Sequence, residues 1–427
     1  MSDPRSKHIR RLASAVVLCC ALAGGGCSFG PQTLERSHGR YNEAIRRVDE
    51  EQLLRNLVHM RYNESPLNLN VSSIAAQYEL SGTAEARPFF IAPNPSNSNI
   101  IFRTFTSILP DLSLSGANRP TLTLLPADNG DAVQQFLTPI TPETLILLQQ
   151  TSWPVATVLR IWTERINGVP NAATASGPQR DFPPDFGRFR RAMELLQQAQ
   201  DLGLGTVHPV EEVVPIGGPL PASAVAATSP VEAAKNGMEF RPNGDETAWS
   251  LVRKEKRLVL DVHPAFLDHP VLEEVAGLLN LRPGLRRYDL VIAPGMAPDP
   301  AKAPLPPSDV IQLNLRSTAQ VYYYLANGVE IPCEHLEAGL VKTPINPDGS
   351  PFDGRAVTEG LFTVHAVQGH KPPSNAFVSV KYRDYWYYVD DRDQASKSTF
   401  ALVLALSRLD FGRQQPGAPF LTLPVGR

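Results

Sequence analysis

Apolar residues recur at helical spacing in some stretches of the chain and alternate with polar residues in others. Residues 41–61 carry an apolar side chain at roughly every third or fourth position among charged ones, which predicts an amphipathic helix. Residues 67–71 read Leu-Asn-Leu-Asn-Val, the period-two alternation of a half-buried strand. Helices are also predicted at 131–137, 145–150, 153–166, 186–202, 270–279, 317–326 and 396–409, and strands at 121–124, 257–262, 289–293, 310–315, 361–367, 377–382 and 385–389.

This mixture of helices and strands, with a hairpin near the end of the chain, predicts an α+β fold of two packed subdomains. Residues 208–245 are rich in proline, alanine and glycine, carry few charges and show no clear period. We interpret them as a linker or loop. It would separate an N-terminal α+β domain, residues 41–207, from a C-terminal α+β domain, residues 246–427.

The first 26 residues have the pattern of an export signal. Residues 1–11 carry four basic side chains against one acid, and residues 12–23 carry no charge. An uncharged stretch of about a dozen residues is shorter than the roughly 20 that span a bilayer, so it is typical of a signal peptide and not of a membrane helix. We therefore predict a signal peptide over residues 1–26.

The small residues before Cys27 resemble a bacterial lipobox, in which lipid is attached to the cysteine. Gly24 stands where the usual leucine would be, and residues 27–40 would form a lipidated tether. Ser28 follows the cysteine instead of an aspartate, which by the same resemblance favours the outer membrane, facing the periplasm. Ordinary cleavage near Ala23, which would leave Cys27 as a free thiol, and an uncleaved anchor remain alternatives.

The net charge and the cysteines narrow the range of functions. The formal net charge is -3, which gives no basic field for nucleic acid. Of the four cysteines, Cys19 and Cys20 leave with the signal and Cys27 is acylated, so Cys333 stands alone in the mature chain. No intramolecular disulfide is therefore expected, and stability has to come from a buried core.

Three carboxylates lie within four residues near the end of the chain, just before a predicted helix. Asp390, Asp391 and Asp393 could ligate a hard cation or serve as acid and base. Acids before a helix N-terminus also favour the helix dipole and cap the helix, which needs no ligand. We favour the capping interpretation and keep a hydrolase as an alternative.

The strands before these acids are rich in aromatic residues. Tyr382, Trp386 and Tyr388 are predicted on one face of the strand pair, and Tyr385 and Tyr387 on the other. Aromatic side chains on an exposed sheet could stack on sugars or on partner loops. As cross-strand pairs they would instead stabilise the hairpin and pack on a helix.

A further group, Cys333, His335, His365 and His370, could supply a thiolate or metal ligands. Adjacent residues on a helix or strand point apart, so Cys333 and His335 are not expected to meet as nucleophile and base. The loop 346–354 is interpreted as an Asp-Gly turn, because it lacks the bidentate glutamate of a calcium loop. No zinc, phosphate-binding or nucleophile-elbow motif occurs, so no metal, cofactor or catalytic residue is predicted.

Three stretches resemble an uncharacterised family of bacterial, mainly proteobacterial, lipoproteins. They are Glu51–Ile74, Pro120–Gly168 and Ala376–Gly426, and the last, with YWYYVDDRDQASKSTFALVLALSRLDF, is the most distinctive. The resemblance covers nearly the whole mature chain. It implies a lipoprotein address and supplies no activity, cofactor or catalytic residue.

Together these patterns predict a lipid-anchored envelope protein that acts as a non-enzymatic scaffold or interaction module at the periplasmic face of the outer membrane. Its expected partners are the membrane, through the anchor, and other proteins of the envelope. The alternatives are an envelope hydrolase that uses the acidic cluster and a module that binds glycan or peptidoglycan through the aromatic face.

Overall fold

Helices and mixed sheets occur together in the structure, a computed structural model, and this confirms the predicted α+β class. The chain divides into two compact units, one holding residues 1–49, 68–129 and 414–427 and the other residues 50–67 and 130–413. The structure describes residues 29–66, 69–89, 107–126, 130–141, 144–145, 148, 153–221, 223, 229–242, 248–293, 306–412 and 421–424.

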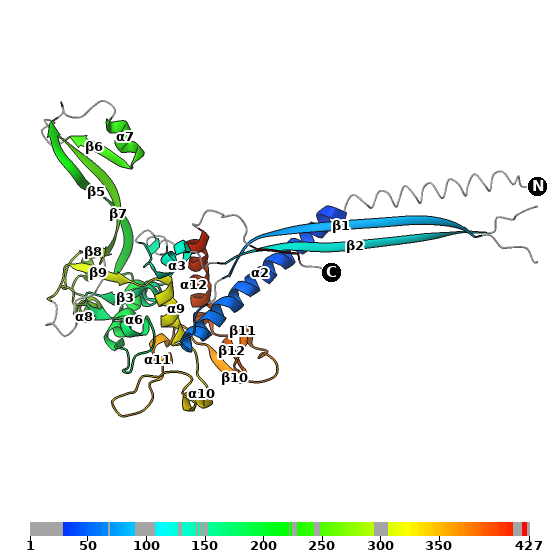
Figure 1. The fold of residues 1–427 in the computed structure, drawn as a ribbon. Helices are drawn as coiled ribbons and strands as arrows, with labels where there is room; N and C mark the ends of the chain where they lie inside the picture. Colours follow the sequence, from blue (N-terminus) through cyan, green and yellow to red (C-terminus); the bar gives the residue numbers. More distant parts are fainter. Residues whose placement is uncertain are drawn as a thin grey trace, which may run out of the picture. The chain divides into compact units, whose positions relative to one another are not determined.

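The first unit contains a three-stranded antiparallel sheet. Its strands are β1 (Leu69–Phe89), β2 (Ser107–Pro126) and β13 (Leu421–Pro424), in the order β1-β2-β13. β1 and β2 form a long antiparallel pair (Figure 1). The strand predicted at 67–71 corresponds only to the start of β1, and the strand predicted at 121–124 only to the end of β2, which pairs with it. β13 pairs with this end of β2.

The helix α2 (Phe29–Arg61) has residues in both units and starts earlier than predicted. The predicted tether over residues 27–40 is therefore helical from Phe29 onward. Its sequence lacks an apolar period, so the pattern did not indicate a helix. Pro31 nevertheless suits the first turn, where its missing N–H would have no partner within the helix. No helix in the described ranges is long and apolar enough to cross a membrane.

The second unit is built on a seven-stranded sheet. Six of its strands follow in the order β4-β3-β9-β8-β7-β5, and β6 pairs with β7. β8 and β9 run parallel, whereas the other pairs are antiparallel. The bounds are β3 (Thr163–Ile166), β4 (Val169–Pro170), β5 (Gly205–Pro221), β6 (Met238–Pro242), β7 (Ala248–Val262), β8 (Arg287–Ile292) and β9 (Val310–Leu315).

This sheet corrects the predicted division at residues 208–245. β3 precedes the predicted linker and β9 follows it, yet the two strands pair, so one sheet joins the two predicted domains. Much of the predicted linker is β5, which pairs along its length with β7. The prolines that suggested a linker are tolerated because β5 is an edge strand, where a residue without an N–H can face away from the ladder.

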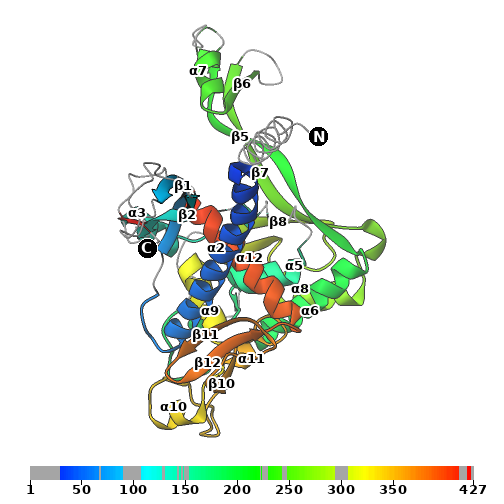
Figure 2. The ribbon, with the colours of Figure 1, turned by 90° about the vertical axis from the view of Figure 1, so that its right-hand side faces the viewer.

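Three helices cover one face of the seven-stranded sheet. They are α5 (Val155–Trp162), α6 (Gly187–Asp201) and α8 (Pro270–Leu278). Figure 2 shows α6 beside α8, and α6 contacts both α5 and α8. α5 ends where β3 begins, so the helix predicted over 153–166 is shorter than expected. Side chains of these helices and of the sheet join one buried core.

Further helices complete the second unit. α9 begins with a capping box of Ser317 and Gln320, and this agrees with the helix start predicted at residue 317. The bounds are α3 (Gly130–Leu137), α7 (Ser229–Lys235), α9 (Thr318–Ala326), α10 (Cys333–Glu337), α11 (Arg355–Thr358) and α12 (Gln394–Gly412), with short 3-10 turns η2 (Ala173–Ala175) and η4 (Pro264–Phe266).

A fully buried arginine, Arg316, joins several of these elements. Its Cζ atom lies 4.0 Å from the ring centroid of Tyr324 in α9. Burial lowers its pKa to about 10, so the side chain stays charged at neutral pH. The carbonyl dipoles and the aromatic ring offset the loss of hydration that burial imposes on the charge. The guanidinium donates hydrogen bonds to the hydroxyl of Ser176 and to the carbonyl oxygens of Arg160, Ile161, Thr163 and Asn171.

Candidate functional site

The candidate site is built on a small three-stranded sheet in the second unit. β10 (His365–Gln368), β12 (Tyr385–Asp390) and β11 (Ala376–Tyr382) are antiparallel and follow in the order β10-β12-β11. β11 and β12 form the predicted hairpin. Its turn residues, Arg383 and Asp384, have φ angles of 45° and 67°. Positive values at both positions fit a two-residue turn to the twist of the strands.

This turn decides which aromatic side chains share a face. Tyr382 pairs with Tyr385, and residues directly opposite each other point to the same side of a sheet. Tyr382 therefore lies with Tyr385 and Tyr387, and the prediction that it shares a face with Trp386 and Tyr388 is wrong. That prediction treated β11 and β12 as one continuous strand, in which all even-numbered residues lie on the same face. The two-residue turn instead places even-numbered residues of β11 opposite odd-numbered residues of β12, such as Tyr382 opposite Tyr385.

The inner face of the sheet belongs to the buried core. Its central aromatic residue, Tyr387, is fully buried. The Tyr387 hydroxyl lies 2.6 Å from the hydroxyl of Tyr62, which in turn lies 2.6 Å from Nδ1 of His335. Hydrogen bonds thus link β12 to the residue after α2 and to α10. We define the inner face as Val378, Val380, Tyr382, Tyr385, Tyr387 and Val389.

Burial keeps this hydrogen-bonded group uncharged. It raises the pKa of the Tyr62 and Tyr387 hydroxyls above their ordinary value. It lowers the pKa of His335, whose protonation the guanidinium of Arg383 also opposes. Two hydroxyls and a neutral imidazole can both donate and accept, so they satisfy one another without a counter-ion.

Glu64 and Arg383 close the border of the inner face. The Tyr382 hydroxyl donates to the Glu64 carboxylate, and Arg383 Nη2 lies 3.0 Å from Glu64 Oε1. Burial and the hydrogen bond to Glu64 raise the pKa of Tyr382 to about 12. Burial alone would raise the pKa of Glu64, but the bonds from Tyr382 and Arg383 outweigh it and hold that pKa below its usual value. These contacts fix the hairpin to the end of α2.

The outer face of the same sheet is only half covered. We define it as His365, Val367, Trp386 and Tyr388, which alternate with the inner residues along β10 and β12. Trp386 and Tyr388 are neither buried nor fully exposed, and Val367 is 39% exposed. The rings of His365 and Tyr388 lie 5.4 Å apart, centroid to centroid. The indole N–H of Trp386 is screened from solvent and has no hydrogen-bond partner among the described residues.

The three predicted acids make the contacts of a turn and a helix cap. Asp393 accepts a hydrogen bond of 3.1 Å from the backbone N–H of Ser396 at the start of α12. Asp390 accepts from the backbone N–H of Arg392 at 2.8 Å, and Asp391 pairs with Lys397 at 2.7 Å. Each carboxylate therefore has a local structural role, as the capping interpretation expected. No group of three or more possible metal ligands lies together in the described part of the chain.

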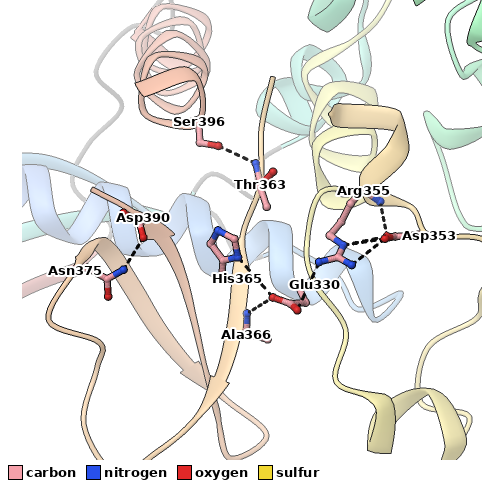
Figure 3. A network of polar contacts seen from close by, with 9 residues as sticks. All are labelled: Glu330, Asp353, Arg355, Thr363, His365, Ala366, Asn375, Asp390 and Ser396. Carbon is pink, nitrogen blue, oxygen red and sulfur yellow. Dashed lines mark hydrogen bonds and ion pairs between the residues drawn. The ribbon is translucent and has the colours of Figure 1, made fainter. Parts of the chain in front are cut away.

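A polar network borders the outer face at β10 (Figure 3). Glu330 lies between two basic groups, with Oε1 3.5 Å from Arg355 Nη1 and Oε2 3.7 Å from His365 Nδ1. The backbone N–H of Ala366 donates to the same carboxylate at 3.1 Å, and Asp353 holds Arg355 at 2.8 Å. The network fixes the start of β10 and leaves His365 beside Tyr388.

The histidine and cysteine candidates are not brought together. His335 is turned towards Tyr62, whereas Cys333 is exposed at the first residue of the short helix α10. In the loop 346–354, the Ser350 N–H and hydroxyl both bind the Asp348 carboxylate, and Gly349 has a φ of 85°. This is the Asp-Gly turn that the sequence predicts. The predicted lipidation site, Cys27, lies outside the described residues.

Sequence reasoning missed the residues that hold the inner face. Tyr62 and Glu64 follow the end of a predicted helix, and Arg383 lies in a predicted turn. The hydrogen bond between Tyr382 and Glu64 spans 318 positions of the chain. Short-range periodicity carries no signal for a contact at that separation.

Comparison with known proteins gives no match to a family model, to a curated protein or to a solved structure. The proposed function therefore rests on the residues of the inner and outer faces of the small sheet.

Proposed function

We propose that this protein is a non-enzymatic, lipid-anchored envelope protein that binds a partner protein through the outer face, on the periplasmic side of the outer membrane. The observation that carries the proposal is the contrast within β12. Tyr387 is sealed in the core, while its neighbours Trp386 and Tyr388 are only partly buried. Tryptophan and tyrosine are enriched at the energetic centres of protein interfaces.

The chemistry of the outer face favours a protein partner that presents apolar or aromatic side chains. Trp386 offers the face of its ring, because its indole N–H is screened from solvent and is not available to a partner. Val367, His365 and Tyr388 give the surrounding apolar and aromatic contact area. The hydrolase alternative is not carried further, because Asp390, Asp391 and Asp393 already have structural partners.

The test is affinity purification of the full-length protein from membranes, with the co-purified proteins identified by mass spectrometry. Trp386→Ala and Tyr388→Ala should each reduce recovery of the partner. Phe182→Ala is the matched control, because Phe182 is also an exposed aromatic residue, 58% exposed, in another part of the unit. Undiminished recovery with both outer-face variants would show that this face is not the contact. The absence of any reproducible partner would contradict the scaffold itself.

Glycan binding is a second candidate, favoured by the partly exposed side chains of Trp386 and Tyr388. Sugar rings stack on such aromatic faces. Sedimentation of the protein with isolated peptidoglycan separates the two candidates. A glycan-binding protein would sediment with it and lose this property in Trp386→Ala, whereas a protein scaffold would stay in the supernatant.

The anchor has a test of its own. Replacing Cys27 by alanine should abolish palmitate labelling and release the protein from the membrane fraction, because the acyl chains supply the attachment. Cys333→Ala is the control. No lipobox-like sequence precedes Cys333, so this variant should leave labelling unchanged. Labelling that persists in Cys27→Ala would refute the proposed site.

A further inference from the structure

An apolar pocket lies between the seven-stranded sheet and the helices α6 and α8, away from the small sheet. Its volume is about 200 Å³. Leu196 and Ala199 of α6 line one side, Val275 and Ala276 of α8 another, and Leu260 of β7 lines the sheet side. For comparison, an engineered apolar cavity of about 150 Å³ stays dry and takes up benzene. The pocket is thus large enough for a small apolar ligand.

A second space of about 50 Å³ adjoins this pocket on the side of the core. Every residue that lines it is aliphatic, from Leu145 and Val158 on the helix side to Ile311 and Leu313 of β9. The two spaces share the lining residues Val155, Leu196, Val207, Leu260, Val275 and Leu281. A wider space followed by a narrow aliphatic one suits a flexible linear chain better than a planar ring system.

The mouth of the pocket is bordered by residues without side chains. Gly203 and Gly284 both line the pocket and are exposed, and an added Cβ atom at either would meet nothing within 4 Å. The polar lining groups are Gln200, Thr206 and Tyr288. Two of them are already engaged, since Gln200 accepts from the Val155 N–H and Tyr288 donates to a backbone carbonyl. The pocket therefore offers an apolar interior below an open mouth.

The loop at this mouth is basic. Three exposed arginines lie in residues 282–287, beside the lining residues Leu281, Gly284 and Leu285. Arg282 pairs with Asp309 at 3.0 Å, and Arg287 pairs with Asp261 at 2.8 Å. The remaining one, Arg286, forms no salt bridge with any described residue. Its charge helps to lower the pKa of Asp261, but no salt bridge occupies the guanidinium itself. A guanidinium of this kind next to an apolar pocket matches a ligand with an aliphatic tail and an anionic head.

We propose that this pocket binds an acyl chain that carries an anionic head group, with the chain between α6, α8 and β7 and the head near Arg286. The occupant is a free fatty acid or one acyl chain of an anionic lipid, since the recognised chemistry is the same. This site is separate from the outer face, and the proposal does not depend on the partner-binding function.

The experiment uses the full-length protein in membranes and a dodecanoic acid that carries a photoreactive diazirine in its tail. After illumination, mass spectrometry should find the probe mainly on peptides from α6, α8 and the end of β7. Excess unlabelled fatty acid should displace it if the site takes free fatty acid. Displacement by vesicles of phosphatidylglycerol alone would identify a lipid chain as the occupant. Labelling spread evenly along the chain would overturn the proposal.

Filling the pocket gives the sharper test. Ala276→Leu should reduce the probe's apparent affinity about tenfold or more, because each methylene group excluded from an apolar site weakens binding roughly fourfold. Gly277→Ala is the matched control, since Gly277 is the next residue of α8, is exposed and does not line the pocket. Ala199→Leu fills the pocket from α6 and is the variant to use if Ala276→Leu does not fold. Unchanged labelling in a folded filling variant would refute the site.

The head group is tested by Arg286→Gln. It should weaken labelling by the fatty acid about threefold, the size expected for a solvent-exposed ion pair, and leave labelling by the methyl ester of the same probe unchanged. Arg282→Gln is the control, because Arg282 is already paired with Asp309. Equal effects on the acid and on the ester would show that Arg286 does not bind the head group.

Discussion

The inner and outer faces of the β10-β12-β11 sheet use the same kinds of residue for opposite purposes. Tyr387 on the inner face is fully buried and shares a hydrogen bond with Tyr62, whereas Tyr388, the next residue, is only partly buried beside His365. One step along a strand turns a side chain to the other face. An aromatic residue in this sequence therefore has no fixed role until the register of its strand is known.

Truncation of the inner face should give the largest effect. Tyr387→Ala leaves a cavity in the core and should lower the free energy of unfolding by about 3–5 kcal/mol, as other buried aromatic residues do. Tyr388→Ala, the neighbour on the outer face, should cost less, about 1–2 kcal/mol, because its ring is only partly buried. Urea unfolding measures both. Equal losses would mean that the two faces do not differ as described.

Removal of only the hydroxyl group sharpens this comparison. Tyr387→Phe keeps the ring and loses the bond to Tyr62, so the free energy of unfolding should fall by about 1 kcal/mol. Tyr388→Phe should leave it unchanged within error. A loss in Tyr388→Phe as large as that in Tyr387→Phe would indicate a buried partner for the outer hydroxyl and would weaken the proposed contact surface.

Asp393 and Asp391 make different kinds of contact, since Asp393 caps α12 and Asp391 forms an ion pair on the surface. Asp393→Ala removes the side-chain acceptor at the start of α12 and should cost about 1 kcal/mol of unfolding free energy. Asp391→Ala removes only its contact with Lys397, in which the carboxylate is 62% exposed, and should cost a few tenths of a kcal/mol. Thermal unfolding of the two variants tests this order. If Asp391→Ala were the more damaging, the acidic cluster would have a role beyond capping.

A pH dependence is the smallest effect expected from the inner face. His335 has a pKa below its ordinary value of 6.5 in the folded chain, because burial opposes its protonation. As the pH falls, the unfolded chain therefore binds a proton at His335 before the folded chain does. The contribution of neutral His335 to stability is complete above about pH 6.5 and is lost as the pH falls towards the folded pKa. The free energy of unfolding should decrease on acidification through this range.

The matched variants for this effect are His335→Gln and His370→Gln. His335→Gln should flatten the decrease, and His370→Gln, at an exposed position, controls for the loss of an imidazole as such. A slope that is unaffected by His335→Gln would show that this imidazole is not the group responsible. Unfolding midpoints in urea, measured across the pH range, provide the comparison.

Local pattern predicted a good part of the fold. The strand predicted at 310–315 has the bounds of β9, and the capping box of α9 lies where the sequence places the helix start. The hairpin of β11 and β12 was also predicted. These elements depend on alternation, caps and turns, which act over a few residues.

The errors arose where distant contacts outweigh local pattern. Prolines suggested a linker at 208–245, but an edge position in the sheet makes them compatible with β5. The face of Tyr382 depends on how many residues form the turn, which alternation within a strand does not reveal. The pocket between α6 and α8 could not be predicted either, since a lining of apolar residues looks like ordinary core in the sequence.

The sequence by itself determined the elements, the α+β class and the capping role of Asp393, because each rests on interactions between residues close along the chain. It also carries the prediction of lipid on Cys27, which no contact in the described ranges tests. Only the tertiary structure decided which aromatic residues share the inner face. Tyr382 joins Tyr387 there because it pairs with Tyr385 and because its hydroxyl contacts Glu64, more than 300 positions away.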